Sequence, residues 1–206
     1  MMRAKFIDLS WDFSNETPVY PGDPKVEIKQ KYSLKKGGFS LHNYRFSGHC
    51  STHIDAPAHF VEGGKTLVEI PLDNFSGEGI VIKALNSNVI DIDILNNIKV
   101  IKNQFVLFYT GFAEKILSRD YFANHPVLSE KLAIRLSELK VKMVGIDCPS
   151  PDIKPYTIHK ILLSHDILII ENLCNLDKLP EKFRVFAFPL KVNTDGVPVR
   201  VVAEKI

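Results

Sequence analysis

The feature that most restricts the fold of this chain is a change of pattern half-way along it. Short β-type runs separated by Pro and Gly dominate the first half, whereas apolar runs alternate with amphipathic segments in the second. One helix is predicted over Ser129–Lys140 with Ser129 as its N-cap, and a shorter one from a cap at Thr157 to Ser164. The pattern predicts a single α/β domain over residues 1–206, with a mostly β core and flanking helices. Strands are expected at Lys5–Leu9, Val26–Gln30, Leu41–Ser47, Gly79–Ala84, Phe105–Tyr109, Val141–Ile146, Ile167–Ile170, Arg184–Pro189 and Val199–Ala203.

Composition excludes several classes of protein. The net charge of +2 is too small for a protein built mainly to bind nucleic acid or an anionic membrane. No apolar run reaches the ~20 residues that span a bilayer, and residues 1–9 lack the apolar core of a signal peptide. Three widely spaced cysteines fit a reducing compartment better than a disulfide framework. We therefore expect a cytoplasmic protein that binds neither nucleic acid nor membrane.

A cluster of histidines is the strongest chemical signal in the sequence. His49, His53 and His59 lie within eleven residues, together with Asp55. Imidazole and carboxylate are ligands that zinc and manganese use. The segment from His49 to Asp55 is predicted to be a turn or loop, free to wrap three side chains around one ion. A proline two residues after Asp55 suits a first helical turn, which would hold His59 near the ion without making it a ligand. The alternative is a set of surface or capping histidines, with Asp55 as an N-cap.

A second pair of ligand-type residues lies farther along the chain. Glu171 ends an apolar run, where a lone buried carboxylate would be costly. His159 lies at the start of the short helix before that run. A helix that runs away and a strand that returns would bring His159 and Glu171 to the same side, although Glu171 could instead face solvent at the strand end. With the first cluster, these side chains suffice for two metal ions that share carboxylates.

The segment His49–Phe60 resembles the His-x-Gly-Thr-His-x-Asp-x-Pro-x-His pattern of the cyclase family of metal-dependent hydrolases, which includes bacterial kynurenine formamidases and isatin hydrolases. Similarity extends to Phe6–Ser10, Tyr20–Asp23, Gly145–Asp147 with Ser150 and Asp152, and the spacing from His159 to Glu171, so it covers nearly the whole chain. The resemblance implies a swivelling β/β/α fold. It also implies a homo-oligomer, a dimer or larger.

The resemblance also implies roles for particular residues. It places His49, His53 and Asp55 on one metal ion and His159 on a second, with Asp55 and Glu171 bridging the two. His59 matches a catalytic proton donor and acceptor, and Tyr20 replaces a tryptophan that contacts substrate. The two ions would be divalent, with zinc favoured and manganese as the alternative.

Three departures from the family pattern bear on the substrate rather than on the ligands. Ser51 replaces a glycine, so the turn is expected to avoid a backbone conformation that only glycine tolerates. Lys160 replaces a second histidine after His159, and Asn172 replaces a glycine after Glu171.

The function implied is metal-dependent hydrolysis of a small-molecule amide at a C–N bond other than a peptide bond. The leading specific hypothesis is conversion of N-formylkynurenine to kynurenine and formate, and the alternative is another cyclic or aromatic amide, as in isatin hydrolase. The residues also leave open a metal-binding protein without catalysis and an enzyme that uses Cys148 as nucleophile. Cys50, between two candidate ligands, is an alternative metal ligand.

Overall fold

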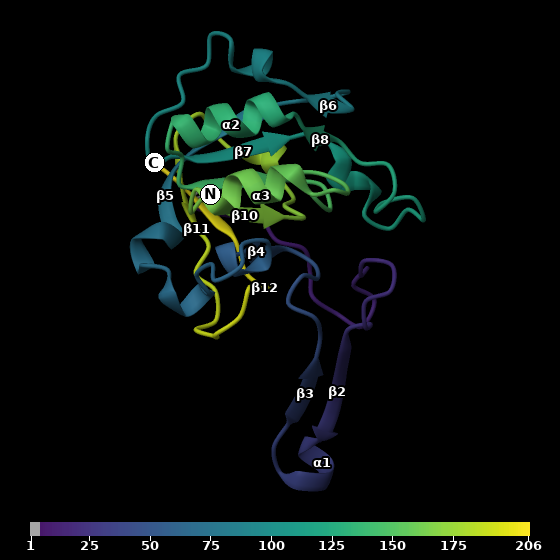
Figure 1. Ribbon diagram of the computed structural model, residues 1–206. Helices are drawn as coiled ribbons and strands as arrows, with labels where there is room; N and C mark the ends of the chain where they lie inside the picture. The colour runs from purple at the N-terminus through teal and green to yellow at the C-terminus, as the bar shows by residue number, and fades with distance from the viewer. Residues whose placement is uncertain (1–4) are drawn as a thin grey trace.

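A mixed β-sheet of nine strands forms the centre of the computed structural model, which describes residues 5–206 (Figure 1). Along the sheet the strands follow the order β1-β13-β11-β5-β7-β9-β10-β4-β12. The four neighbours β5, β7, β9 and β10 pair in parallel, and the other pairs are antiparallel. The strands are β1 (Phe6–Asp8), β4 (His53–Asp55), β5 (Ser76–Lys83), β7 (Phe105–Tyr109), β9 (Met143–Ile146), β10 (Leu168–Glu171), β11 (Phe183–Phe186), β12 (Gly196–Pro198) and β13 (Val202–Lys205).

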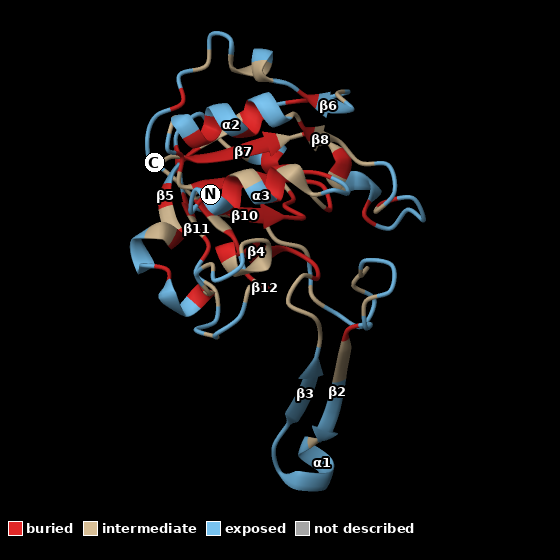
Figure 2. Cartoon of the chain, in the orientation of Figure 1, coloured by how far each residue is buried: buried red, intermediate tan, exposed pale blue. Residues whose placement is uncertain are grey.

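The central strands are buried on both faces, which explains their nearly continuous apolar sequence. Helices α2 (Glu130–Glu138) and α3 (Thr157–Ser164) cover one face of the sheet (Figures 1 and 2). On β7, Val106 and Phe108 pack in the core on that side, whereas Phe105 and Leu107 belong to a second core on the opposite face. The side chains alternate between the two cores because successive residues of a strand point to opposite faces.

Smaller elements complete the chain. Strands β6 (Val89–Ile90) and β8 (Val127–Leu128) form a separate short pair. The hairpin of β2 (Glu27–Tyr32) and β3 (Leu41–Arg45), closed by α1 (Leu34–Gly37), projects away from the rest of the molecule (Figure 1). Within residues 5–206, no helix combines the length and the apolar character needed to cross a membrane. The 3₁₀ turns are η1 (Pro57–His59), η2 (Leu67–Glu69), η3 (Leu72–Phe75), η4 (Ile92–Leu95), η5 (Phe112–Lys115) and η6 (Leu176–Lys178).

The structure confirms the α/β class and corrects two local predictions. Ser129 caps α2, accepting a hydrogen bond from the Leu132 amide at 3.1 Å. Thr157 does not cap α3. Instead, Asp152 accepts hydrogen bonds from the backbone amides of residues 158 and 159, at 2.7 and 3.1 Å. The capping carboxylate belongs to Asp152, in the loop before the helix, so the local sequence pattern predicted the wrong capping residue. Residues 1–4, part of the N-terminal segment considered for export, lie outside the described residues.

The second correction concerns the segment predicted as a loop from His49 to Asp55. Its last three residues form β4, which pairs with β10 on one side and β12 on the other. Strand β12 carries only three residues, Gly196–Pro198, and has no alternating pattern that would have revealed a partner. The histidine cluster is therefore built partly on the sheet rather than on a free loop.

Candidate metal centre

Strand geometry brings the first three candidate ligands together. His53 and Asp55 are two residues apart on β4 and therefore point to the same face of the sheet. Glu171 on β10 lies directly opposite His53 in the antiparallel register, so its side chain joins the same face. His159, in the first turn of α3, reaches the group from the side. All four side chains are buried, Asp55 completely.

The two carboxylates each face both buried imidazoles. Glu171 presents Oε2 to His53 Nε2 and Oε1 to His159 Nε2, both at 3.2 Å. Asp55 presents Oδ1 to His53 Nε2 at 3.4 Å and Oδ2 to His159 Nε2 at 3.8 Å. Each carboxylate thus has one oxygen directed towards each histidine, the arrangement that a pair of bridging ligands requires.

The buried imidazoles are oriented by hydrogen bonds on their outer sides. His53 Nδ1 donates to the Ser51 carbonyl at 2.9 Å, and His159 Nδ1 contacts Asp152 Oδ1 at 2.6 Å. Because a carbonyl and a carboxylate can only accept, both Nδ1 atoms carry hydrogen. The Nε2 atoms are therefore directed inward, as in metal-ligating histidines, in which the other ring nitrogen donates its hydrogen to an oxygen.

The polar atoms without a hydrogen-bond partner at the centre of the site are suited to bind a cation. Among the described residues, His53 Nε2, Asp55 Oδ2 and Glu171 Oε1 are buried and have no hydrogen-bond partner. A buried polar group without a partner costs about 1–3 kcal/mol, and more if charged, so three in one place call for a ligand. Burial alone would raise the pKa of Asp55, but the neighbouring imidazoles of His53, His159 and His49 outweigh it and hold that pKa well below its ordinary value. The centre therefore keeps negative oxygens available for a divalent metal.

His49 and His59 form a second layer around Asp55. His49 Nδ1 lies 2.8 Å from Asp55 Oδ1, and its Nε2 lies 2.9 Å from Asp195 Oδ2. The His59 ring stacks on that of His49 with 3.8 Å between centroids, and its Nδ1 lies 3.0 Å from the same Asp195 oxygen. Gly196 leaves the room for this layer, because a Cβ there would lie 2.4 Å from His49 Cε1. Ligand atoms of His49, Asp55 and His59 are all within 4.8 Å of one another.

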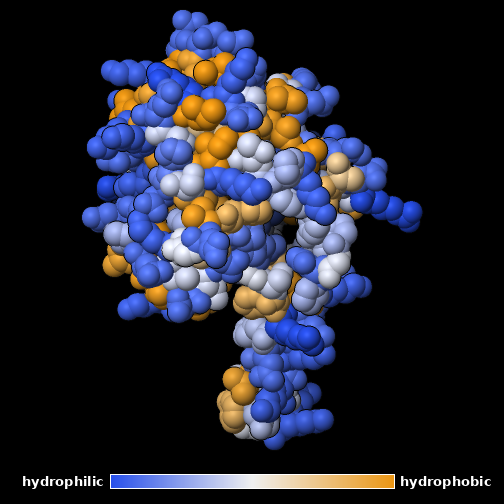
Figure 3. Space-filling model, in the orientation of Figure 1, coloured by the Kyte–Doolittle hydropathy of each residue, from blue (hydrophilic) through white to orange (hydrophobic). Residues whose placement is uncertain are grey.

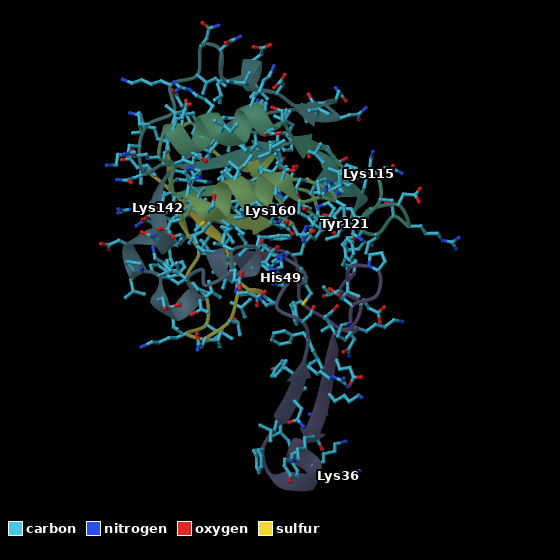
Figure 4. The ribbon with its side chains drawn as sticks, in the orientation of Figure 1. Lys36, His49, Lys115, Tyr121, Lys142 and Lys160 are labelled. Atoms are coloured by element: carbon cyan, nitrogen blue, oxygen red, sulfur yellow. The ribbon has the colours of Figure 1, made fainter. Side chains whose placement is uncertain are left out.

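The histidines open into a pocket of about 610 Å³, a size typical of small-molecule sites. Figure 4 shows His49 where the projecting hairpin joins the body. The Tyr20 ring lies on the pocket wall and packs edge-to-face on Phe122, with 5.7 Å between centroids. Phe60 and Tyr156 form a further aromatic part of the wall, their centroids 5.3 Å apart.

The seven residues predicted to form the site meet at this pocket. Six of them line it directly, and Asp55 lies beneath His49. The sequence analysis named Asp152 only as part of the resemblance and missed that it orients His159, and it missed Asp195, the acceptor for His49 and His59. The chain offered little signal for Asp195, because the Asp195-Gly196 pair predicts only a turn.

Ser51 and Asn172, which stand where the family pattern has glycine, share a left-handed backbone that residues other than glycine also adopt in this chain. Ser51 adopts φ 56°, in the left-handed region that glycine favours, and Asn172 adopts the same φ. The Asn172 side chain donates to the Ser51 carbonyl at 3.0 Å, while its Oδ1 accepts from Tyr121 at 2.8 Å. Asparagine visits this region more readily than most residues. Both positions therefore keep a glycine-like backbone, stabilised by side-chain hydrogen bonds.

The cysteines lack the surroundings of reactive or ligating thiols. Cys50 donates to the Ser47 carbonyl at 3.1 Å, and burial raises its pKa to about 11. Burial also raises the pKa of Cys148 well above its ordinary value, with the Asp147 charge adding to the effect. A nucleophilic cysteine needs a lowered pKa. The geometry thus favours the histidine–carboxylate centre over either thiol.

Comparisons with known proteins give a consistent result. A family model described as "Putative cyclase" matches residues 7–153. The chain is 32% identical to a kynurenine formamidase of Geobacillus thermodenitrificans and 30% identical to one of Bacillus anthracis, each over the full length of both chains. Among solved structures, a potential metal-dependent hydrolase with cyclase activity is 28% identical, with a TM-score of 0.82 over 98% of both chains. Isatin hydrolase A of Labrenzia aggregata superposes with a TM-score of 0.86 at 23% identity, covering 96% of this chain and 92% of that one, and so shares the fold.

Proposed function

The chain belongs to the cyclase family, and from that premise we propose that it is a metal-dependent hydrolase of amide C–N bonds, acting on N-formylkynurenine to give kynurenine and formate. The observation that carries the proposal is the pair of buried carboxylates, each directed towards two inward-facing imidazoles and opening into an aromatic-walled pocket. The full-length kynurenine formamidase relatives support this substrate.

We propose two divalent ions, zinc first and manganese as the alternative. His49, His53 and Asp55 would hold one, and His159 the other, with Asp55 and Glu171 shared. The direction of the carboxylate oxygens supports this division, since each carboxylate has one oxygen facing His53 and one facing His159. Divalent zinc would supply Lewis acidity: it lowers the pKa of bound water to about 7 and polarises a carbonyl oxygen.

His59 is the proposed proton carrier. Burial lowers the pKa of His59, so that the ring is neutral at neutral pH and able to accept a proton. It would take the proton from the attacking water and return it to the leaving nitrogen, which departs as an amine while the acyl carbon gains the hydroxyl oxygen. Tyr20 and Phe122 would contact the aromatic ring of the substrate, as their place on the wall suggests.

The position of His59 favours a catalytic metal site over a purely structural one. A structural site closes around its ligands and needs no further imidazole. Here the four buried ligand-type residues already surround the centre, and His59 stands outside them on the pocket side, partly exposed.

We further propose that the enzyme acts in the cytoplasm as a homo-oligomer. All three cysteines are free and buried, which suits a reducing compartment. That residues 1–206 form one domain stays a prediction, supported by the single sheet that runs from β1 to β13.

Metal removal and replacement test the proposed function. Protein stripped with a chelator is expected to hydrolyse N-formylkynurenine at background rate and to recover when zinc or manganese is added, because the carboxylate–imidazole centre has no other source of Lewis acidity. The measurement is formate release, with bound metal determined by mass spectrometry on the same samples. Undiminished activity in fully stripped protein would overturn the metal-dependent proposal. Tight uptake of two metals without turnover would reject the formamidase assignment and direct the search to isatin-like cyclic amides.

A further inference from the structure

We propose that Lys154 and Asp23 make the pocket selective for aromatic amides that carry an amino-acid tail, with Lys154 binding the carboxylate of the tail and Asp23 its ammonium group. The inference rests on the proposed function, and it adds the residues that would distinguish N-formylkynurenine from a neutral amide such as isatin. Both residues line the pocket, apart from the candidate metal ligands. Lys154 is exposed and Asp23 is half-buried, so both charges are accessible to a ligand.

Two tight turns place these charges on the pocket. In the first turn, the backbone amide of Asp23 donates to the carbonyl of Tyr20 at 3.0 Å. In the second, which contains Lys154, the amide of Tyr156 donates to the carbonyl of Ile153 at 2.9 Å. Each turn therefore presents one tyrosine and one charged side chain to the pocket.

The two tyrosines belong to one aromatic wall. Tyr20 packs on Phe122, as described above, and Tyr156 packs on Phe60. The tyrosines also meet each other, since a side-chain hydrogen bond with Tyr20 raises the pKa of Tyr156 above its ordinary value. Figure 3 shows a mostly hydrophilic outer face with its apolar residues in separate patches, whereas the aromatic side chains of the pocket are continuous. An aromatic ring held against this wall would have a charged residue of each sign nearby.

Neither charge is occupied by a protein partner. Elsewhere in the chain exposed charges pair, as Lys65 does with Asp166 at 2.6 Å, but within residues 5–206 the side chains of Lys154 and Asp23 form no ion pair or hydrogen bond. Of the pocket-lining residues in this part of the chain, Lys154 is the only lysine or arginine. The two other carboxylates on the lining already contact candidate metal ligands. The pocket thus offers one uncommitted group of each sign.

These two signs match the tail of N-formylkynurenine. An α-carboxyl group has an ordinary pKa of about 3.3–3.7 and an α-amino group one of about 7.7–8.0, so the tail carries both charges at neutral pH. The lysine ammonium donates to a carboxylate, and the aspartate accepts from an ammonium group. A neutral amide would make neither contact. Because the tail is remote from the reacting bond, its loss is expected to raise KM more than it lowers kcat.

The test compares two substrates of the zinc-loaded full chain, N-formylkynurenine and 2-formamidoacetophenone, which is the same aryl formamide without the amino-acid tail. Wild type is expected to prefer N-formylkynurenine through a lower KM. Lys154→Met and Asp23→Asn should each reduce the ratio of the two kcat/KM values about 3- to 10-fold, an effect between that of an exposed ion pair and that of a buried charged hydrogen bond. Lys154→Arg keeps the charge and should retain most of the preference.

The matched control is Lys160→Met, which should keep the wild-type ratio. Lys160 lies on α3 outside the pocket lining, and its Nζ donates to the Pro155 carbonyl at 3.0 Å (Figure 4). Isothermal titration adds a readout without turnover. Kynurenine should bind wild type more tightly than 2-aminoacetophenone does, and Lys154→Met should remove most of that difference. Unchanged circular dichroism spectra would show that the variants fold.

The outcomes separate this inference from the proposed function. Equal KM values for the two substrates in wild type, equal affinities for the two products, or a ratio that Lys154→Met leaves unchanged would overturn the inference and leave the formamidase assignment intact. An unchanged ratio in Asp23→Asn would overturn the assignment of the ammonium group. Hydrolysis of neither substrate by the zinc-loaded protein would instead overturn the proposed function, because the truncated substrate reports on the formamide chemistry alone.

Discussion

Asp55→Asn is expected to empty the centre of both metal ions and to abolish hydrolysis. Asp55 is the residue that the two proposed ion positions share, with Oδ1 near His49 and His53 and Oδ2 near His159. An asparagine keeps the shape but has one oxygen, so its amide NH₂ would face an imidazole nitrogen or the ion. We expect kcat/KM to fall at least ~10³-fold, equivalent to about 4 kcal/mol of transition-state stabilisation.

Thermal unfolding with and without zinc gives a readout independent of turnover. A ligand at 100 times its Kd stabilises the folded state by about 2.7 kcal/mol, and each kcal/mol shifts Tm by roughly 2–4 °C in a chain of this size. Zinc should therefore raise the Tm of wild type by roughly 5–10 °C and leave that of Asp55→Asn unchanged. Asp93→Asn, which neutralises an exposed carboxylate on η4, should behave as wild type. Two ions retained by Asp55→Asn would show that Asp55 is not the shared ligand.

The candidate ligands could be identified from sequence because their chemistry is carried by residue type and short spacing. His53 and Asp55 share a face of β4 through a separation of two, and a single turn that begins at Pro57 brings His59 back to them. Glu171 was recognisable because a carboxylate ending an apolar strand needs a partner. In each case the signal lies in residue type and short spacing, although the segment from His49 to Asp55 was predicted as a loop and its last three residues form β4.

The outer partners could not be predicted, because they depend on long-range pairing. Asp195 is 146 positions from His49, and it reaches the site only because the three-residue strand β12 pairs with β4. Asp152 both caps α3 and accepts a hydrogen bond from the His159 ring, and neither role can be recognised from the neighbouring sequence. Similarly, the left-handed backbone at Ser51 follows from a contact with Asn172, which lies on a different strand end. Sequence thus predicts the ligands, whereas the folded sheet determines how they are oriented.

His59→Ala is expected to keep both metal ions while losing most of the turnover. The ring stands beside the centre, partly exposed, and its Nδ1 contacts Asp195 rather than a buried carboxylate. Removal of a general acid–base group typically lowers rates by about 10²–10⁴, which corresponds to about 2.7–5.5 kcal/mol. The measurement pairs kcat with metal content in the same protein. His165→Ala, at the exposed end of α3, is the matched control.

The metal content decides between two roles that the geometry permits for His59. Its ring nitrogen lies within 4.8 Å of ligand atoms of His49 and Asp55, close enough for a third ligand of the same ion. A ligand would be needed for binding, so His59→Ala would then lose about one metal per chain along with activity. A proton carrier would be needed only for turnover, so the variant would bind metal as wild type does. Because Asp195 occupies Nδ1, we expect the second result, with the His59 lone pair directed to the substrate rather than to the ion.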